Sequence, residues 1–479
     1  MWQQNAGLPK RWILFLLVTL GVAGIALQFR TIFGRDAGVA LLVFFMALKP
    51  LEMRQRRDAV VLVMLGFFLL LTHYFYSQSI PTGLWLLAVS ALLTATLIRL
   101  HGGEQPVQSI LRYAGLLLAQ ATPFMLILFL LFPRVNGPLW GLPQDAYSGL
   151  TGLSERMAPG SLNNLIQSGN IAFRAQFSDA APQQNQLYWR GPVLDSYDGQ
   201  SWTRRSLPMR STSSVQPRIE AGKTSFKYTT TLEAHNQRWL LALDLPLALP
   251  GESSLSSRLE ALSREGVHNR SRYTFTSSPD AVANRQEAPE ILRHAQTLPG
   301  TLNPRSRQLA ADWREQWLSP EAISNAALRF FRNENFYYTL QPPLLGEHAI
   351  DDFMFTTRRG FCEHFAAAYV VLMRAAGIPA RVVTGYQGGE LNPIDGYLTV
   401  RQSDAHAWAE IWIADKGWLR VDPTAAVAPS RIERGISAAL PSDESLPALV
   451  RIDTDWLRNL RNRWEAANHA WNQWVLGFH

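Results

Sequence analysis

Three residue types that together can perform nucleophilic catalysis follow one another toward the C-terminal end of the chain. Cys362, the only cysteine in 479 residues, opens a helix-like run, His406 lies in a strand-like segment, and Asp422 follows a second one. A thiol activated by an imidazole, with a carboxylate that fixes the imidazole tautomer, is the arrangement required for acyl transfer through a covalent intermediate. We therefore predict Cys362, His406 and Asp422 as catalytic residues.

The helix that begins at Cys362 predicts how the sulfur is activated. A helix start places the sulfur near free backbone N–H groups and the positive end of the helix dipole, which favour the thiolate. The N–H of Cys362 is then also a candidate oxyanion donor. We expect the helix to end at Ala376, because Gly377 suits the position after the cap and Pro379 blocks continuation.

A hairpin is expected to bring the other two residues together. His406 and Glu410 share one face of an alternating segment, and residues 418–422 alternate as well. With Asp415-Lys416-Gly417 as a three-residue turn, an ideal ladder places Asp422 opposite Glu410 rather than His406. Direct contact between His406 and Asp422 therefore requires a bulge, a strong twist or a different turn register.

Each catalytic candidate also has a plain structural explanation. A buried cysteine is usually a small apolar side chain, a strand histidine usually packs or faces solvent, and an aspartate before proline often begins a turn. The combination favours catalysis, and the surrounding motifs Gly-Phe-Cys-Glu-His-Phe, Asp-Ala-His-Ala-Trp-Ala-Glu and Val-Asp-Pro-Thr strengthen it. Over roughly residues 325–428 the chain resembles the transglutaminase-like superfamily, whose fold is papain-related.

The resemblance implies acyl transfer from a glutamine carboxamide to a primary amine through a cysteine thioester. The expected partners are then a protein or peptide glutamine donor and a primary-amine acceptor. Trp408 and Tyr386 are candidates for lining the acceptor cleft, with packing in the core as the alternative for both. Water in place of the amine would make the same triad a cysteine peptidase or amidase of envelope peptides. A membrane-tethered binding module without enzymatic activity is the third possibility.

The sequence indicates no cofactor. It contains no metal-ligand spacing, no glycine-rich phosphate loop and no dinucleotide fingerprint, and acidic pairs such as Asp351-Asp352 are too short to specify a calcium cage. A single cysteine allows no internal disulfide. The net charge of +7 averages two unlike regions and requires no nucleic-acid partner. The sequence does not indicate an oligomeric state.

The first 133 residues carry nearly all the long apolar runs. These runs are Trp12–Leu27, Ala37–Leu48, Ala59–Phe75, Leu84–Ile98 and Tyr113–Phe132. A spanning helix needs about 20 apolar residues, so we expect about five transmembrane helices, the second being the shortest. Burial in a large soluble core is the alternative, and five dense runs in succession argue against it.

The basic residues of the short loops predict the orientation of these helices. Lys10 and Arg11 precede the first run, Arg99 and Arg112 flank the loop between the fourth and fifth, and the richest loop carries Lys49, Arg54, Arg56 and Arg57. Because basic loops stay preferentially in the cytoplasm, an odd number of spans exports everything after Phe132. We predict a multi-pass protein of the cell inner membrane, in contact with the lipid bilayer, with a periplasmic catalytic domain.

The predicted fold is multi-domain: a transmembrane bundle, a β-rich exported region and an α+β papain-like transglutaminase core. The expected parts are a transmembrane region (1–133), a connection (134–165), a β-rich domain (166–285), the catalytic core (300–430) and a C-terminal linker with an amphipathic Trp-rich helix (431–479). The strands expected in the β-rich domain are Ile171–Phe177, Leu187–Val193, Lys227–Glu233, Arg238–Ala242 and Tyr273–Thr276.

This layout resembles that of bacterial inner-membrane protein-glutamine gamma-glutamyltransferases. Those proteins usually continue into a further span and a cytoplasmic tail, whereas this sequence stops at His479. We therefore expect either a truncated chain or a final helix that lies on the core or at the membrane interface.

Overall fold

The computed structural model describes residues 10–29, 32, 34–53, 55–74, 76, 80–102, 105–131, 152–204, 217–440 and 455–474. The chain divides into two compact units. One is Met1–Gly149 with Asn468–Gly477, and the other is Leu150–Ala467 with Phe478–His479.

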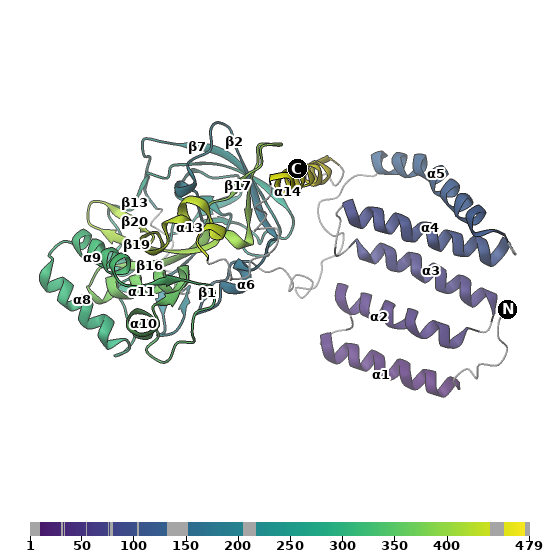
Figure 1. The fold of residues 1–479 in the computed structure, drawn as a ribbon, viewed down its shortest axis with the longest axis horizontal. Coiled ribbons are helices and arrows are strands. Elements are labelled where there is room, and N and C mark those ends of the chain that lie inside the picture. Colours follow the sequence, from purple (N-terminus) through teal and green to yellow (C-terminus); the bar gives the residue numbers. More distant parts are fainter. Residues whose placement is uncertain are drawn as a thin grey trace. The chain divides into compact units, whose positions relative to one another are not determined.

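Within its described residues, the first unit contains five successive helices, each packed against the next (Figure 1). They are α1 (Arg11–Phe29), α2 (Arg35–Leu48), α3 (Arg56–His73), α4 (Ile80–Gly102) and α5 (Val107–Leu131), with a short 3₁₀ turn, η1 (Lys49–Glu52), after α2. Apolar side chains such as Phe15, Leu27 and Phe124 are 74%, 81% and 71% exposed. Such extensive apolar exposure suits contact with lipid rather than water.

Among the described helices, three are long and apolar enough to cross a membrane: α1, α4 and α5. Helix α2 has 14 residues, which extend about 21 Å at 1.5 Å per residue, less than the roughly 30 Å of a bilayer core. Helix α3 begins with Arg56, Arg57 and Asp58, which shortens its apolar part. The expected count of five spans is therefore not confirmed. Arg54 of the basic loop and most of the expected connection, residues 134–151, lie outside the described residues.

The second unit is built on two large sheets. The six-stranded sheet has the order β17-β18-β2-β7-β12-β9, and the seven-stranded sheet has the order β6-β13-β20-β19-β16-β3-β8. The strands of the first are β2 (Ile171–Phe177), β7 (Phe226–Leu232), β9 (Pro246–Ala248), β12 (Ser271–Ser277), β17 (Glu390–Leu391) and β18 (Leu398–Arg401). Those of the second are β3 (Tyr188–Leu194), β6 (Ile219–Glu220), β8 (Ala242–Leu243), β13 (Val282–Ala283), β16 (Ala380–Gln387), β19 (Ala405–Ile413) and β20 (Gly417–Val421).

Shorter elements complete this unit. The small sheets contain β1 (Arg156–Met157), β4 (Ser196–Tyr197) and β5 (Trp202–Thr203), β10 (Ser253–Leu255) and β11 (Ala261–Ser263), and β14 (Tyr337–Tyr338) and β15 (Arg359–Gly360). The α-helices are α6 (Asn163–Ile166), α7 (Pro289–His294), α8 (Pro304–Gln316), α9 (Pro320–Asn333), α10 (Ala349–Asp351), α11 (Cys362–Ala375), α12 (Thr424–Val427), α13 (Pro429–Arg434) and α14 (Asp455–Trp474). The other helical turns are η3 (Gln184–Gln186), η4 (Asp352–Thr357), η5 (Gln402–Asp404) and η6 (Ile436–Ala438).

The β-rich stretch and the catalytic stretch share both large sheets. In one sheet, β2 pairs with β18, and Phe173 lies opposite Val400. In the other, β3 pairs with β16, and Trp189 lies opposite Tyr386. A central strand such as β16 needs a hydrogen-bonding neighbour on each side, and the preceding stretch supplies one of them. The expected boundary between residues 285 and 300 therefore does not separate two packing units.

Four of the five expected strands match observed strands to within one or two residues at each end: β2, β3, β7 and β12. The fifth strand, predicted at Arg238–Ala242, is wrong. Trp239 forms only an isolated bridge, and the strand there, β8, begins at Ala242. Leu241 and Asp244 adopt positive φ angles of 51° and 48°, which interrupt an extended strand.

Helix α11 lies beside α8, α9, α10 and β16 in the second unit (Figure 1). Every residue from Cys362 to Arg374 is buried, and the helix packs against β19, β16 and α8. A helix that is apolar around most of its circumference is stable only inside a protein. It ends at Ala375, one residue before the expected Ala376, which is its cap. Gly377 follows with φ 80° and donates its N–H to the Arg374 carbonyl at 3.0 Å.

Candidate active site

The hairpin of β19 and β20 brings His406 and Asp422 into direct contact. His406 Nε2 lies 2.8 Å from Asp422 Oδ2. The ladder pairs Glu410 with Arg420, so the register is shifted by two residues from the ideal one that we expected. Asp415 and Gly417 both adopt positive φ angles, 63° and 74°, and the turn contains residues 414–416. A different turn register therefore makes the contact, without a bulge between these two strands.

Asp422 is held as a carboxylate by several donors. Its Oδ2 also accepts a hydrogen bond from the Tyr188 hydroxyl at 2.8 Å, and its Oδ1 accepts one from the Thr424 N–H at 2.9 Å. Burial opposes ionisation, but the charge and hydrogen bond of His406 and the Tyr188 hydrogen bond outweigh it and lower the pKa of Asp422. The carboxylate is thus ionised at neutral pH and fixed in orientation.

His406 is fully buried, and burial is the main influence that lowers its pKa, although Asp422 acts in the opposite direction. The imidazole is therefore neutral at neutral pH. Because an ionised Asp422 can only accept, Nε2 carries the ring proton and Nδ1 keeps a lone pair. Within the described part of the chain, Nδ1 is buried and has no hydrogen-bond partner. This arrangement leaves Nδ1 available as a general base.

The sulfur of Cys362 lies beside the strand that carries His406. Cys362 is the first residue of α11, and its sulfur accepts a hydrogen bond from the N–H of Ala407, the neighbour of His406. Burial raises the pKa of Cys362 to about 12, although the cation of Arg431 acts in the opposite direction. The helix start alone predicts a thiolate, and this prediction is wrong, because loss of solvation outweighs the helix dipole. Proton removal must therefore accompany attack on the substrate.

Arg431 is a buried cation that sequence reasoning missed. It belongs to α13 and is fully buried. Its guanidinium donates to Gln387 Oε1 at 2.9 Å and to the carbonyls of Asp404 and Ala405 at 3.3 and 3.4 Å. Its charge favours the thiolate of Cys362, so it partly compensates for the burial of the sulfur. No sequence signal marks it, because one arginine in a surface-like helix is ordinary.

Tyr188 was also missed, because it comes from β3, far from the motifs in sequence. It packs edge-on against Trp408, with ring centroids 5.3 Å apart. Trp408 itself is fully buried and stacks near His406, at a centroid distance of 6.4 Å. Tyr386 is buried as well, and its hydroxyl lies 2.6 Å from Gln402 Oε1. Trp408 and Tyr386 thus pack in the core, which is the alternative to lining the acceptor cleft.

Glu410 anchors β19 on the face that carries His406. Its carboxylate forms ion pairs with Arg190 of β3 and with Arg381 of β16, the latter at 2.8 Å. Burial opposes its ionisation, but the two guanidinium groups outweigh it and lower the pKa of Glu410 to about 2. The ion pairs therefore join three neighbouring strands, β3, β16 and β19, of which β19 carries His406.

A hollow of about 460 Å³ opens beside the segment that leads into Cys362. Tyr338 and Arg359 of the paired strands β14 and β15 form one wall, and Pro429 and Leu440 lie on the other. Burial is the main influence that raises the pKa of Tyr338, and a negative charge on the Cys362 sulfur acts in the same direction, so the two side chains lie near each other. Because it adjoins the strand that leads into Cys362, this hollow is a candidate opening for a substrate.

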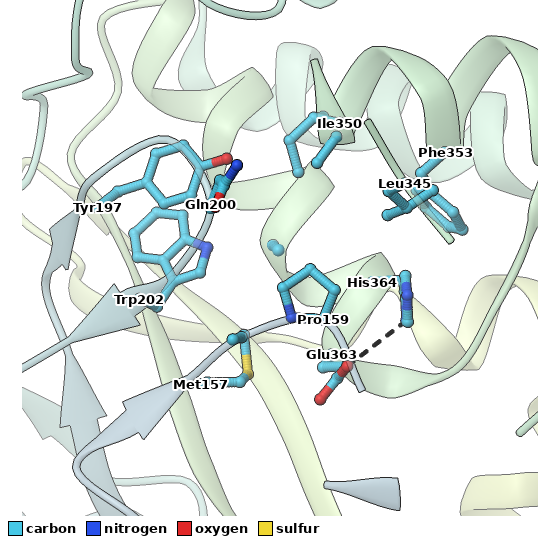
Figure 2. Close-up of a pocket in the computed structure, with 13 residues that line it drawn as sticks. Met157, Pro159, Tyr197, Gln200, Trp202, Leu345, Ile350, Phe353, Glu363 and His364 are labelled. Atoms are coloured by element: carbon cyan, nitrogen blue, oxygen red, sulfur yellow. Dashed lines mark ion pairs between the residues drawn. The ribbon is translucent and has the colours of Figure 1, made fainter. Parts of the chain in front are cut away.

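A second pocket is lined in part by α11 and has room for only about one water, at about 20 Å³. Figure 2 shows Glu363 and His364 of α11 at its edge, with Trp202 and Tyr197 on the facing strands. Burial raises the pKa of Glu363 to about 7, even though its carboxylate accepts hydrogen bonds from the N–H groups of Gly160 and Leu162. The pocket is too small for a peptide side chain, so Glu363 fastens residues 160–162 to the catalytic helix.

The acidic pair Asp351-Asp352 has a structural role. Asp351 accepts hydrogen bonds at 2.8 Å from the N–H groups of Arg305 and Ser306, the first turn of α8. These bonds satisfy two of the donors that a helix start leaves unpaired. Asp352 accepts from the N–H of Gly346, also at 2.8 Å. Both carboxylates therefore stabilise loops and a helix end.

Comparisons with known proteins give relatives for both parts of the chain. Residues 1–283 match the TgpA N-terminal domain, and residues 308–423 match the transglutaminase-like superfamily. The chain is 41% identical over 486 residues to a protein-glutamine gamma-glutamyltransferase of Pseudomonas aeruginosa, covering 100% of this chain and 72% of that protein. YebA of Bacillus subtilis is 41% identical over 86 residues, 17% of this chain and 12% of YebA.

A solved structure covers most of the second unit. The crystal structure of the periplasmic domain of TgpA from Pseudomonas aeruginosa matches with a TM-score of 0.57 and 42% sequence identity. The match covers 61% of this chain and 100% of that domain.

Proposed function

This chain belongs to the TgpA family of transglutaminase-like enzymes, and we propose that it exchanges the amide of a glutamine side chain for a primary amine. The observation that carries the proposal is the hydrogen bond between His406 Nε2 and Asp422 Oδ2, 2.8 Å long. It leaves Nδ1 as a base on the strand whose next residue, Ala407, contacts the Cys362 sulfur.

In the proposed reaction, Cys362 Sγ attacks the glutamine carboxamide carbon while His406 Nδ1 takes the thiol proton. The imidazolium that forms is stabilised by Asp422 and gives its proton to the departing ammonia. The resulting thioester is attacked by a primary amine, whose proton passes to His406 and then to the sulfur as the thiolate leaves. The enzyme is thereby restored, and the product is a secondary amide.

The oxyanion formed in each attack needs hydrogen-bond donors. Cys362 is the first residue of α11, and the first N–H groups of a helix have no partner within the helix. The Cys362 N–H is therefore the proposed oxyanion donor. Arg431 supports the same step, because its buried positive charge offsets negative charge that develops near the sulfur.

We also propose that the enzyme is a multi-pass protein of the cell inner membrane, with its catalytic unit in the periplasm. Helices α1, α4 and α5 are long and apolar enough to span a bilayer, and the matching solved structure is a periplasmic domain. The substrates are then a protein or peptide glutamine and a primary amine on the periplasmic side, entering through the hollow beside β14 and β15.

The test uses the full-length chain in detergent micelles, wild type and Cys362→Ala, with a glutamine-containing peptide and a primary amine. We expect wild type to produce a peptide whose mass corresponds to replacement of ammonia by the amine, and the variant to produce none. Deamidated or cleaved peptide whose formation depends on Cys362 would show that the enzyme is a hydrolase rather than a transferase. Absence of any Cys362-dependent product with a panel of peptides would favour a binding module.

A further inference from the structure

Helix α14 turns its polar side toward the second unit. It contacts β17, β18 and the turn between them through two ion pairs and a hydrogen bond. These are Arg461 with Glu390, Glu465 with Arg401, and Asn392 Nδ2 donating to the Asn462 carbonyl at 2.9 Å. Asn462 is only 5% exposed, so this side of the helix is firmly docked.

The opposite side of the same helix is apolar and exposed. Trp456, Leu460 and Trp464 follow one another at intervals of four residues, and they are 67%, 58% and 46% exposed. At about 100° per residue, these three side chains form one stripe, and Asn462 and Glu465 lie on the other side of the helix axis. An ordinary surface helix buries its apolar stripe and exposes its polar side, so the orientation of α14 is reversed.

Leu457 extends the stripe along one side of α14, and it is 37% exposed. The stripe and Leu457 lie on the same helix, so they form one surface. We call the surface of Trp456, Leu457, Leu460 and Trp464 the α14 face. A contiguous apolar surface of this kind usually marks a binding site.

We propose that the α14 face lies in the interface of the bilayer that the chain's own apolar helices are suited to cross. Tryptophan is enriched at the boundary between lipid and water, because its ring is apolar and its N–H is polar. Amphipathic helices with Trp and Leu on one side bind in the plane of that boundary. The exposed Arg463 next to the stripe suits anionic headgroups.

Attachment to the membrane makes a small surface sufficient. Helices α1, α4 and α5 belong to the same chain, so the α14 face meets the bilayer at a high effective concentration and needs little intrinsic affinity. The consequence is that the catalytic unit is held against the membrane through its β17–β18 edge. This proposal does not depend on the acyl-transfer chemistry.

Site-directed spin labelling of the full-length chain tests the proposal. The chain, with Cys362→Ser to remove the native thiol, is reconstituted in vesicles of phosphatidylcholine and phosphatidylglycerol and labelled at Leu460→Cys. The matched control is Leu318→Cys in the turn between α8 and α9, where leucine is 98% exposed but outside the α14 face. Collision rates with oxygen, which concentrates in lipid, and with a water-soluble nickel complex are measured by power saturation.

We expect the label at position 460 to collide more with oxygen than with nickel, and the label at position 318 to do the opposite. Labelling at Trp464→Cys should give the same result as position 460, which guards against failure of one variant to fold. Equal water accessibility at 460 and 318 would overturn the proposal. So would shielding of position 460 from both reagents, which would indicate that a second copy or another protein covers the face.

Discussion

Tyr188 is the residue whose role in the active site is most sharply testable. Its hydroxyl donates to Asp422 Oδ2 at 2.8 Å, and Tyr188→Phe removes that bond while leaving the ring packed on Trp408. A hydrogen bond to an ionised group contributes about 1.5–3 kcal/mol, and about 1.36 kcal/mol changes a rate tenfold. If the whole energy of this hydrogen bond stabilises the transition state, its loss lowers kcat/KM by about 10- to 150-fold. We expect about tenfold, because His406 and the Thr424 N–H still hold the carboxylate.

The pH dependence distinguishes this role from a loss of packing. The Tyr188 hydrogen bond helps to lower the pKa of Asp422, so its removal raises that pKa. Activity requires ionised Asp422 and neutral His406, which titrate as a coupled pair, and it is lost as pH falls through the acid pKa values of that pair. A more basic Asp422 also stabilises the His406 cation, so both effects act in the same direction. The acid limb of the profile of kcat/KM against pH should therefore move to higher pH in Tyr188→Phe.

The matched control is Tyr386→Phe, which also removes a buried tyrosine hydroxyl, the one bonded to Gln402 Oε1 at 2.6 Å. That hydroxyl does not contact the triad, so the acid limb should stay in place. In an Asp422→Asn background, Tyr188→Phe should have little further effect on kcat/KM. The reasoning is refuted if both phenylalanine variants behave alike, or if Tyr188→Phe has its full effect without the Asp422 carboxylate.

Three further expectations concern buried charges. Glu410→Gln should lower the free energy of unfolding by about 3–5 kcal/mol, because it leaves Arg190 and Arg381 buried without a carboxylate; chemical denaturation at pH 7 measures this. In wild type, the pKa of Glu410, lowered to about 2, gives a contribution to stability that is present above its unfolded pKa near 4.5 and is lost as pH falls toward 2. Arg431→Gln should slow alkylation of Cys362 at pH 8 about tenfold, the effect of losing about 1.4 kcal/mol of thiolate stabilisation.

Each of these has a clear contrary result. Unchanged denaturation midpoints in Glu410→Gln would mean that the two arginines do not depend on the carboxylate. If the free energy of unfolding falls equally with decreasing pH in wild type and Glu410→Gln, other groups cause the loss of stability. If Cys362 is alkylated at the same rate in wild type and in a correctly folded Arg431→Gln variant, the guanidinium does not stabilise the thiolate.

The local features of the active site could be predicted from the sequence, because short-range patterns determine them. The end of α11 follows from Gly377, and alternation alone places His406 and Asp422 on one face. The observed register differs from the ideal one by two residues. An even shift preserves the face of every side chain, so His406 and Asp422 share a face in both registers. Alternation alone left their direct contact open.

Long-range features could not be predicted in this way. Tyr188 reaches Asp422 because β3 lies next to β16, and strand alternation does not specify which strands become neighbours. The raised pKa of Cys362 depends on how completely α11 is buried, whereas the sequence shows only that the thiol begins a helix. The division at residues 285–300 failed for the same reason, since two consecutive stretches of chain interleave their strands in both large sheets.

The most direct test of the central claim is the mass of the enzyme itself during turnover. Full-length protein is mixed with a glutamine-containing peptide without an amine acceptor, quenched in acid and digested. We predict a fragment containing Cys362 whose mass has increased by that of the peptide less ammonia, and which disappears when a primary amine is added before the quench. An acyl adduct on another residue, or turnover to amide product with no adduct on Cys362 at any quench time, would contradict the account.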